Sequence, residues 1–235
     1  MNTFRIGAVI PFNGGLSRVA ERAQDFARYR FAHYWLAQAF SVDALTALTA
    51  IGQHLPGVEL GTSVVPIYGR HPMTLAMQAL TAQAALGGRL TLGVGLSHRW
   101  VIEEMLGLSF ARPARHMREY LQALVPMLNG EQVDYTGETV ATHLLRGPLD
   151  VPDAAPVPVL VAALGPRMLE IAGRMTQGTL TWMTGPRTIA AHIVPAISAA
   201  ARAAGRRPPR IAAGIQFCVS GDDAAARAYA GPPQE

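Results

Sequence analysis

Short apolar runs alternate with longer stretches of helical periodicity along most of this chain, and this alternation constrains the fold more than any other feature. Strands that are buried on both faces read as continuous apolar runs, and a helix carries the chain back to the start of the next strand. Such crossovers are right-handed and produce a parallel sheet. The sequence therefore predicts a fold of the α/β class.

Seven core strands are predicted, at residues 5–10, 33–37, 58–65, 89–95, 157–162, 178–183 and 210–219. Helices are predicted between them, at 17–29 with Ser17 as N-cap, 43–54, 72–85, 165–173 and 186–204. The chain stops as another helix begins at Asp222, so a (β/α)8 TIM-type barrel would lack its eighth unit. We expect a single barrel domain over residues 1–235, interrupted at about 99–155 by an insert with helices at 101–106 and 113–128 and a hairpin at 133–140.

Charge and composition limit the classes of molecule that this protein is expected to bind. Half of the residues are apolar and 15% are charged, which argues against disorder. The net charge is +4, but the arginines are scattered, and the one tight run, 206–210, is interpreted as a solvated loop rather than a nucleic-acid contact. An anionic small molecule is the expected partner, and no nucleic acid or membrane is expected.

The start of the sequence, its apolar runs and its cysteine bear on where in the cell the protein is expected. The sequence contains neither a signal peptide at its start nor an apolar run of the ~18 residues needed to span a bilayer. The single cysteine, Cys218, excludes an intrachain disulfide, fits a reducing cytosol and is interpreted as an inert core thiol. A cytoplasmic protein is expected.

Candidate ligand sites in a parallel barrel follow the strands, at their carboxyl ends. Few carboxylates stand there, and no HxH, HExxH or CxxC pattern occurs, so no metal site is expected. Gly93 and Gly95 end the fourth strand. Their absent side chains could let a cofactor approach the backbone or could relieve crowding inside the barrel, and the sequence leaves both readings open.

Two further strand ends carry candidate groups. Residues 163–167, Ala-Leu-Gly-Pro-Arg, start a helix whose free N–H groups would bind an anion, and Arg167 adds a full charge. His98 follows the glycine-rich strand and could move a proton. Trp35 and Trp182 are expected in the core or the pocket wall, whereas Trp100 is freer to face a ligand.

Several motifs together resemble the luciferase-like monooxygenases, and among them the group that uses the deazaflavin coenzyme F-420. The resemblance covers nearly the whole chain. The matching segments are 61–66 (GTSVVP) with 70–72 (RHP), 88–95 (GRLTLGVG), 112–113 (RP) with 119–121 (EYL), 163–169 (ALGPRML) and 181–186 (TWMTGP).

The resemblance implies a barrel with a cofactor at the carboxyl ends of its strands and hydride transfer at the cofactor ring. It also implies a cis peptide bond between Ser63 and Val64. The cofactor-binding residues that it indicates are Ser63, Val64, Gly95, Leu96, Ser97, Ala163, Leu164, Gly165, Pro166 and Arg167. His98 is the catalytic candidate.

One departure from the family pattern limits the substrate. Sugar-phosphate dehydrogenases of this family carry an Asp-His pair after the second strand, where this chain has Gln38-Ala39-Phe40, so that substrate is not expected. We expect hydride transfer between reduced F-420 and an organic substrate. An FMN-dependent monooxygenase and a non-catalytic flavin-binding barrel are the alternatives. A barrel isomerase or aldolase is not supported, because this sequence has no lysine or acid pair at the ends of its strands. The missing unit also favours a homodimer.

Overall fold

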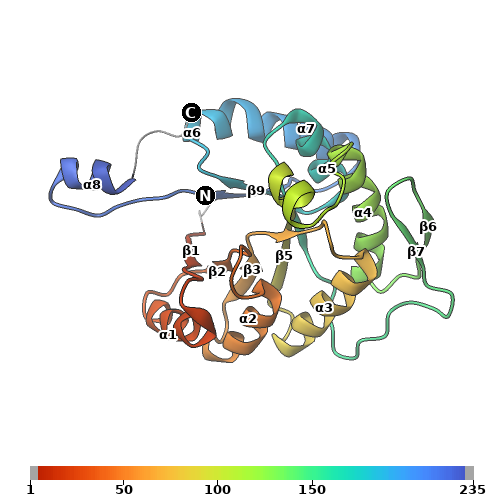
Figure 1. Cartoon of the computed structure of the whole chain (residues 1–235), viewed down its shortest axis with the longest axis horizontal. Coiled ribbons are helices and arrows are strands. Elements are labelled where there is room, and N and C mark those ends of the chain that lie inside the picture. Colours follow the sequence, from red (N-terminus) through yellow and green to blue (C-terminus); the bar gives the residue numbers. More distant parts are fainter. Residues whose placement is uncertain (1–4, 231–235) are drawn as a thin grey trace.

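A computed structural model describes residues 5–230 and builds one parallel sheet in which successive strands lie side by side (Figure 1). The strand order is β1-β2-β3-β5-β8-β9-β10, and the short β4 pairs with β5. The strands are β1 (Gly7–Ile10), β2 (His33–Leu36), β3 (Glu59–Thr62), β4 (Val65–Pro66), β5 (Leu90–Gly95), β8 (Val159–Ala162), β9 (Gly178–Trp182) and β10 (Arg210–Gly214). Within the described residues no strand bridges β10 and β1. This open, sequentially wound barrel confirms the predicted fold, including the missing eighth unit.

Helices cover the outer face of the sheet (Figure 1). They are α1 (Gly15–Ala27), α2 (Ala44–Ile51), α3 (Pro72–Ala85), α4 (Pro113–Leu128), α5 (Pro166–Met175), α6 (Pro186–Thr188) and α7 (Val194–Ala203), whereas a last helix, α8 (Asp223–Ala230), does not pack on the sheet. A 3-10 turn, Gly52–His54, follows α2, and π-helical turns occupy Val101–Met105 and Ile189–Ile193. The main apolar core fills the space between the helices and the sheet. None of the described helices combines the length and the apolar character needed to cross a bilayer.

Local signals explain where two of the helices start. The Asp43 carboxylate accepts the Thr46 N–H at 3.0 Å and so caps α2. His71 caps α3 in the same way, because its Nδ1 accepts the Met73 N–H at 3.2 Å, while Pro72 fixes the first helical φ. The His71 Nε2 lies 2.8 Å from the Ala141 carbonyl oxygen and donates to it. His71 is therefore a structural residue that joins α3 to the inserted hairpin.

Two predicted boundaries are wrong. Gly14, with a φ of 95°, is the N-cap of α1, and the helix begins at Gly15, so Ser17 lies within the first turn. The predicted strand 210–219 ends at Gly214, because its partner β9 offers no residue beyond Trp182. The following segment leads to α8, which lies away from the body of the molecule in Figure 1. Cys218 in this segment is exposed, which contradicts its interpretation as a core thiol.

The insert lies between β5 and β8 and contains the expected hairpin. Its strands are β6 (Asp134–Thr136) and β7 (Ala141–His143), so the second strand lies just beyond the predicted range of 133–140. The hairpin runs along the outside of the molecule beyond α4 (Figure 1).

A small apolar cluster fills the inside of the open barrel. It consists of Trp35, Leu160 and Leu180, with Val64 and Ala212 packed against them. Gly61 makes this packing feasible, because a side-chain carbon at its position would overlap the Trp35 ring. Trp35 is therefore in the core, one of the two places predicted for it, whereas Trp182 is 53% exposed, and its place in a pocket wall stays a prediction.

A polar cluster lies below this apolar one, at the amino ends of the strands. Arg210 at the start of β10 forms an ion pair with Glu59 at the start of β3, across the barrel. The Thr91 hydroxyl donates to Glu59 Oε1 at 2.8 Å, and Arg5 Nη1 lies 3.3 Å from Oε2. The Arg210 guanidinium also covers the Trp35 ring at 5.4 Å. We call Glu59, Arg210, Thr91 and Arg5 the barrel floor, and Arg210 is not the solvated loop residue that the sequence predicted.

Hydrogen bonds and charges set the ionisation of the barrel floor. Burial alone would raise the pKa of Glu59. The hydrogen bonds from Arg210 and Thr91 and the positive charges of Arg210 and Arg5 outweigh burial, so the pKa lies below its ordinary value. Glu59 is therefore a carboxylate at neutral pH and ties two opposite walls of the barrel together.

Candidate cofactor and substrate site

The carboxyl end of β3 separates from β5 and then rejoins it. Backbone pairing between the two strands is recorded at Leu60 and Gly61. The Thr62 hydroxyl then bridges the gap, since it donates to the Gly93 carbonyl oxygen and accepts the Gly93 N–H, both at 2.8 Å. Pairing resumes in β4, where Val65 lies opposite Val94. Ser63 and Val64 therefore form a bulge between β3 and β4, and the peptide bond between them is cis, which confirms that expectation.

The two glycines at the end of β5 each leave room for a neighbouring residue. A side-chain carbon on Gly93 would overlap the Thr62 carbonyl oxygen and lie 2.7 Å from Leu180 Cδ1, so Gly93 relieves crowding inside the barrel. A side-chain carbon on Gly95 would lie 2.6 Å from Val64 Cγ2. Gly95 therefore makes room for the bulge, and the crowding reading accounts for both positions.

The loop after β5 presents His98. Leu96 and Ser97 are half-buried, and Ser97 has a left-handed φ of 63°, which turns the chain before His98. The His98 side chain is exposed and forms no hydrogen bond to another described residue. Its imidazole is therefore free to meet a molecule bound at this edge of the sheet.

The start of α5 is open to a ligand. Gly165 is the N-cap, and a side-chain carbon built on it would meet no atom within 4 Å. Because Pro166 has no N–H, the free amides of the first turn are those of Arg167 and Met168. The Arg167 side chain is exposed and forms no ion pair with any described residue. Free amides beside an unpaired guanidinium suit a phosphate.

The predicted cofactor residues lie on neighbouring strand ends. Val94 pairs with Val65 on one side and with Val161 on the other, so the end of β5 lies between the bulge and the end of β8. A side-chain carbon on Gly95 would be 3.4 Å from Ala162 Cβ. The segment 163–167 continues directly from this point. The structure thus brings the Ser63–Val64 bulge, Gly95 and the strand before Gly165 together along one edge.

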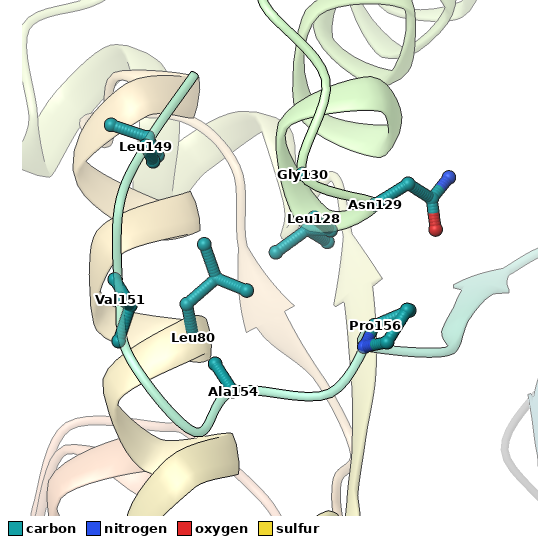
Figure 2. A pocket seen from close by; sticks show the side chains of 8 residues that line it. All are labelled: Leu80, Leu128, Asn129, Gly130, Leu149, Val151, Ala154 and Pro156. Carbon is teal, nitrogen blue, oxygen red and sulfur yellow. The ribbon is translucent and has the colours of Figure 1, made fainter. Parts of the chain in front are cut away.

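Two cavities lie elsewhere. One, of about 100 Å³, is enclosed by α3, the end of α4 and the segment before β8, and Figure 2 shows Leu80, Leu128 and Val151 in its wall. Another, of about 190 Å³, lies between α4 and α5. Neither is at the carboxyl ends of the strands, where the missing eighth unit leaves the barrel open on one side. The candidate site is partly exposed: residues 164–167 are exposed, residues 63–64 and 96–97 are half-buried, and Gly95 and Ala163 are buried.

Aromatic side chains stand at the same edge. The Phe40 and Trp100 rings lie 5.9 Å apart at an angle of 45°. Phe40 is 68% and Trp100 is 49% exposed, which leaves Trp100 free to face a ligand. Leu164, Trp182 and Met183, at the ends of β8 and β9, are also about half exposed. Within residues 5–230 no group of three or more His, Cys, Asp or Glu side chains could hold a metal ion.

A buried polar cluster beside the site was not predicted. The Thr139 hydroxyl lies 2.7 Å from Glu119 Oε2 and 3.1 Å from His116 Nδ1. Because the hydroxyl donates to the carboxylate, it accepts from His116 Nδ1, and His116 Nε2 keeps its lone pair. His116 Nε2 and the hydroxyls of Tyr68 and Tyr120 are buried and have no partner within the described residues. His116, Glu119 and Tyr120 share one face of α4, but Tyr68 and Thr139 are too far away in the sequence for a pattern to join them to this helix.

Burial sets the ionisation of this cluster. It lowers the pKa of His116 and raises that of Tyr120, so all three aromatic side chains are neutral near pH 7. The stacking of His116 on Tyr68, with ring centroids 4.4 Å apart, ties α4 to the segment after β4.

Fold and site together define a class of protein: an open parallel β/α barrel whose carboxyl edge carries a half-buried backbone bulge and an exposed helix start. The sequence model of the family described as luciferase-like monooxygenase matches residues 3–234. The chain belongs to this family.

Individual relatives are similar over part of their length. An uncharacterized protein of Mycobacterium tuberculosis is 33% identical over 190 residues, which cover 77% of this chain and 55% of that protein. An F-420-dependent hydroxymycolic acid dehydrogenase of the same species is 32% identical over 228 residues, which cover 90% of this chain and 61% of the relative. The chain thus spans little more than half the length of these relatives.

The fold is also similar to that of a solved structure. The F-420-dependent tetrahydromethanopterin reductase from Methanopyrus kandleri superposes with a TM-score of 0.80 at 24% identity, over 94% of this chain and 68% of the reductase. This likeness confirms the luciferase-like barrel.

Proposed function

We propose that this chain is an oxidoreductase that binds coenzyme F-420 and transfers a hydride between it and a small organic molecule. One observation carries the proposal: the free amides and the unpaired Arg167 at the start of α5 adjoin the glycine-rich end of β5. This arrangement fits a phosphorylated cofactor. The similarity to an F-420-dependent dehydrogenase supports the choice of cofactor.

Different residues of the chain would bind the cofactor phosphate, support the cofactor ring and transfer a proton. Arg167 and the first-turn amides of α5 would hold the cofactor phosphate, and Ala163, Leu164 and Pro166 shape that turn. Backbone at Ser63 and Val64 would support the ring, with Gly95, Leu96 and Ser97 beside it. The cofactor supplies or accepts the hydride when bound. His98 would give a proton to the substrate oxygen as a carbonyl becomes an alcohol, or take it in the reverse direction.

The cofactor phosphate provides the first test. Arg167→Ala should raise the Kd for F-420 about tenfold, since a charge-assisted hydrogen bond to phosphate contributes about 1.5 kcal/mol or more. Fluorescence titration with F-420 measures this. Arg202→Ala is the matched control, because Arg202 lies in the last turn of α7 and should leave the Kd unchanged. Equal losses in both variants would count against a phosphate site at α5.

His98 provides a separate test. His98→Gln should lower kcat about a hundredfold, the lower end of what a proton-transferring group contributes, and leave the Kd for F-420 within about twofold. Stopped-flow oxidation of reduced F-420 by a panel of carbonyl compounds measures the rate. Unchanged turnover in this variant would remove His98 from the mechanism.

Two other functions share the same site. The family description favours a monooxygenase, for which FMN is the alternative cofactor, and titration of the purified protein with FMN beside F-420 decides between the cofactors. The open barrel and the few titratable groups at the strand ends favour a flavin-binding protein without activity. Tight cofactor binding without turnover on the whole panel would select that reading. The homodimer and the cytoplasmic location stay predictions.

A further inference from the structure

Phe40 and Trp100 meet across the end of β3. Phe40 lies four residues after β2 and Trp100 five residues after β5, and these strands are the two neighbours of β3 in the sheet. Because the strands are parallel, the loops after β2 and β5 leave the sheet at the same edge. Their rings come within 5.9 Å of each other. The aromatic pair therefore stands beside the Ser63–Val64 bulge, on the side where a cofactor ring would lie.

The pair is exposed although it consists of large apolar side chains. Phe40 is 68% and Trp100 is 49% exposed, and Leu164, Trp182 and Met183 add half-exposed apolar side chains at the same edge. Single exposed apolar residues are ordinary, but several of them at the ligand edge of a parallel barrel indicate a binding surface. Aromatic rings provide flat contact area at little conformational cost.

Polar side chains near the pair already form hydrogen bonds or ion pairs within the protein. The Asp43 carboxylate caps α2 and forms an ion pair with Arg70 at 2.7 Å. Gln38 Oε1 accepts the Ala44 N–H at 3.3 Å.

The charge of Arg99, next to Trp100 in the sequence, is also engaged. Its guanidinium lies over the Phe110 ring at 5.2 Å and pairs with Glu103 at 2.9 Å. The aromatic pair therefore offers neutral ring surface, and His98, in the same loop as Trp100, is a titratable group whose side chain forms no hydrogen bond to another described residue.

We propose that Phe40 and Trp100 form an aromatic clamp that contacts the substrate and selects a flat, apolar, ring-containing molecule. This inference rests on the proposed function, because it places the substrate beside the cofactor ring. Among the described residues, a sugar phosphate would find the arginines next to the clamp, Arg70 and Arg99, already paired with carboxylates. A neutral ring system with one carbonyl or hydroxyl group would stack on the pair and direct its oxygen to His98.

Binding of menadione, a flat apolar quinone, tests the clamp. Equilibrium dialysis with and without F-420 gives the Kd for the wild type and for Phe40→Ala and Trp100→Ala. We expect each alanine variant to raise the Kd about tenfold, as loss of an aromatic contact does. Trp100→Phe, which keeps a ring, should stay within about threefold of the wild type. Leu145→Ala is the control, because Leu145 is 82% exposed and lies outside the site.

Each further outcome bears on one claim. Unchanged menadione binding in both alanine variants would overturn the clamp, and so would tighter binding of glucose 6-phosphate than of menadione. A change from dimer to monomer in Trp100→Ala, seen by sedimentation velocity, would show that a second copy covers the pair and would also overturn it. F-420 titration of the same variants should change less than about twofold. Wild-type protein that binds menadione but not F-420 would refute the proposed function and leave the clamp standing.

Discussion

Gly93→Ala is expected to destabilise the fold by about 3 kcal/mol or more, at the upper end of what overpacking costs. The added carbon would overlap the Thr62 carbonyl oxygen, which belongs to the backbone. Thr62 cannot move away freely, since its hydroxyl holds both the N–H and the carbonyl oxygen of Gly93. Urea denaturation followed by circular dichroism gives the free energy of unfolding.

Gly185→Ala is the matched control for this substitution. Gly185 has a φ of −67°, and a side-chain carbon there would meet no atom within 4 Å. Its free energy of unfolding should stay within about 1 kcal/mol of the wild-type value. If Gly93→Ala proved as stable as this control, the crowding account of the end of β5 would be wrong.

The second large effect is expected at the barrel floor. Glu59→Gln should cost about 3 kcal/mol at pH 7, because it leaves the Arg210 charge without its partner. We take the lower end of the cost of breaking a buried ion pair, because the Glu59 and Arg210 side chains are 16% and 32% exposed. Glu170→Gln is the control, because Glu170 forms an exposed pair with Arg174, and it should change stability by less than about 0.5 kcal/mol.

The difference between wild type and Glu59→Gln should depend on pH. The folded-state pKa of Glu59 is lowered, so its stabilisation is fully present above the unfolded-state value of about 4.3. It is lost as the pH falls through the lower, folded-state pKa. Urea denaturation of both proteins at several pH values should show the difference shrinking below about pH 4. A difference that stays constant into this acid range would show that Glu59 does not act through its charge.

Periodicity predicted much of the fold. Apolar runs such as 89–95 gave the correct strand order because each is buried on both faces, and successive units of this kind can wind in one direction. The Gly-Pro-Arg sequence that follows the strand before residue 163 also identified Gly165 and Arg167 as an open helix start at the carboxyl ends of the strands. Its use by a cofactor remains a prediction.

Most of the wrong predictions share a physical cause, because they depend on a partner that is distant in the sequence. The sequence could not show that Arg210 pairs with Glu59, 151 residues away, or that Gly93 faces the Thr62 carbonyl. The strand predicted to Val219 had apolar residues but no neighbour to extend it. Ser17 resembled a cap, yet the left-handed conformation of Gly14 starts the helix earlier.

The barrel floor has a consequence for how this molecule can move. Arg210 and Glu59 join opposite walls at the amino ends of the strands. Above it, the interior is filled by the apolar cluster of Trp35, Leu160 and Leu180. Such contacts are not directional, so they tolerate small sliding better than an ion pair does. The ion pair at the base of the barrel therefore fixes the separation of β3 and β10 more strictly than the apolar packing above it does.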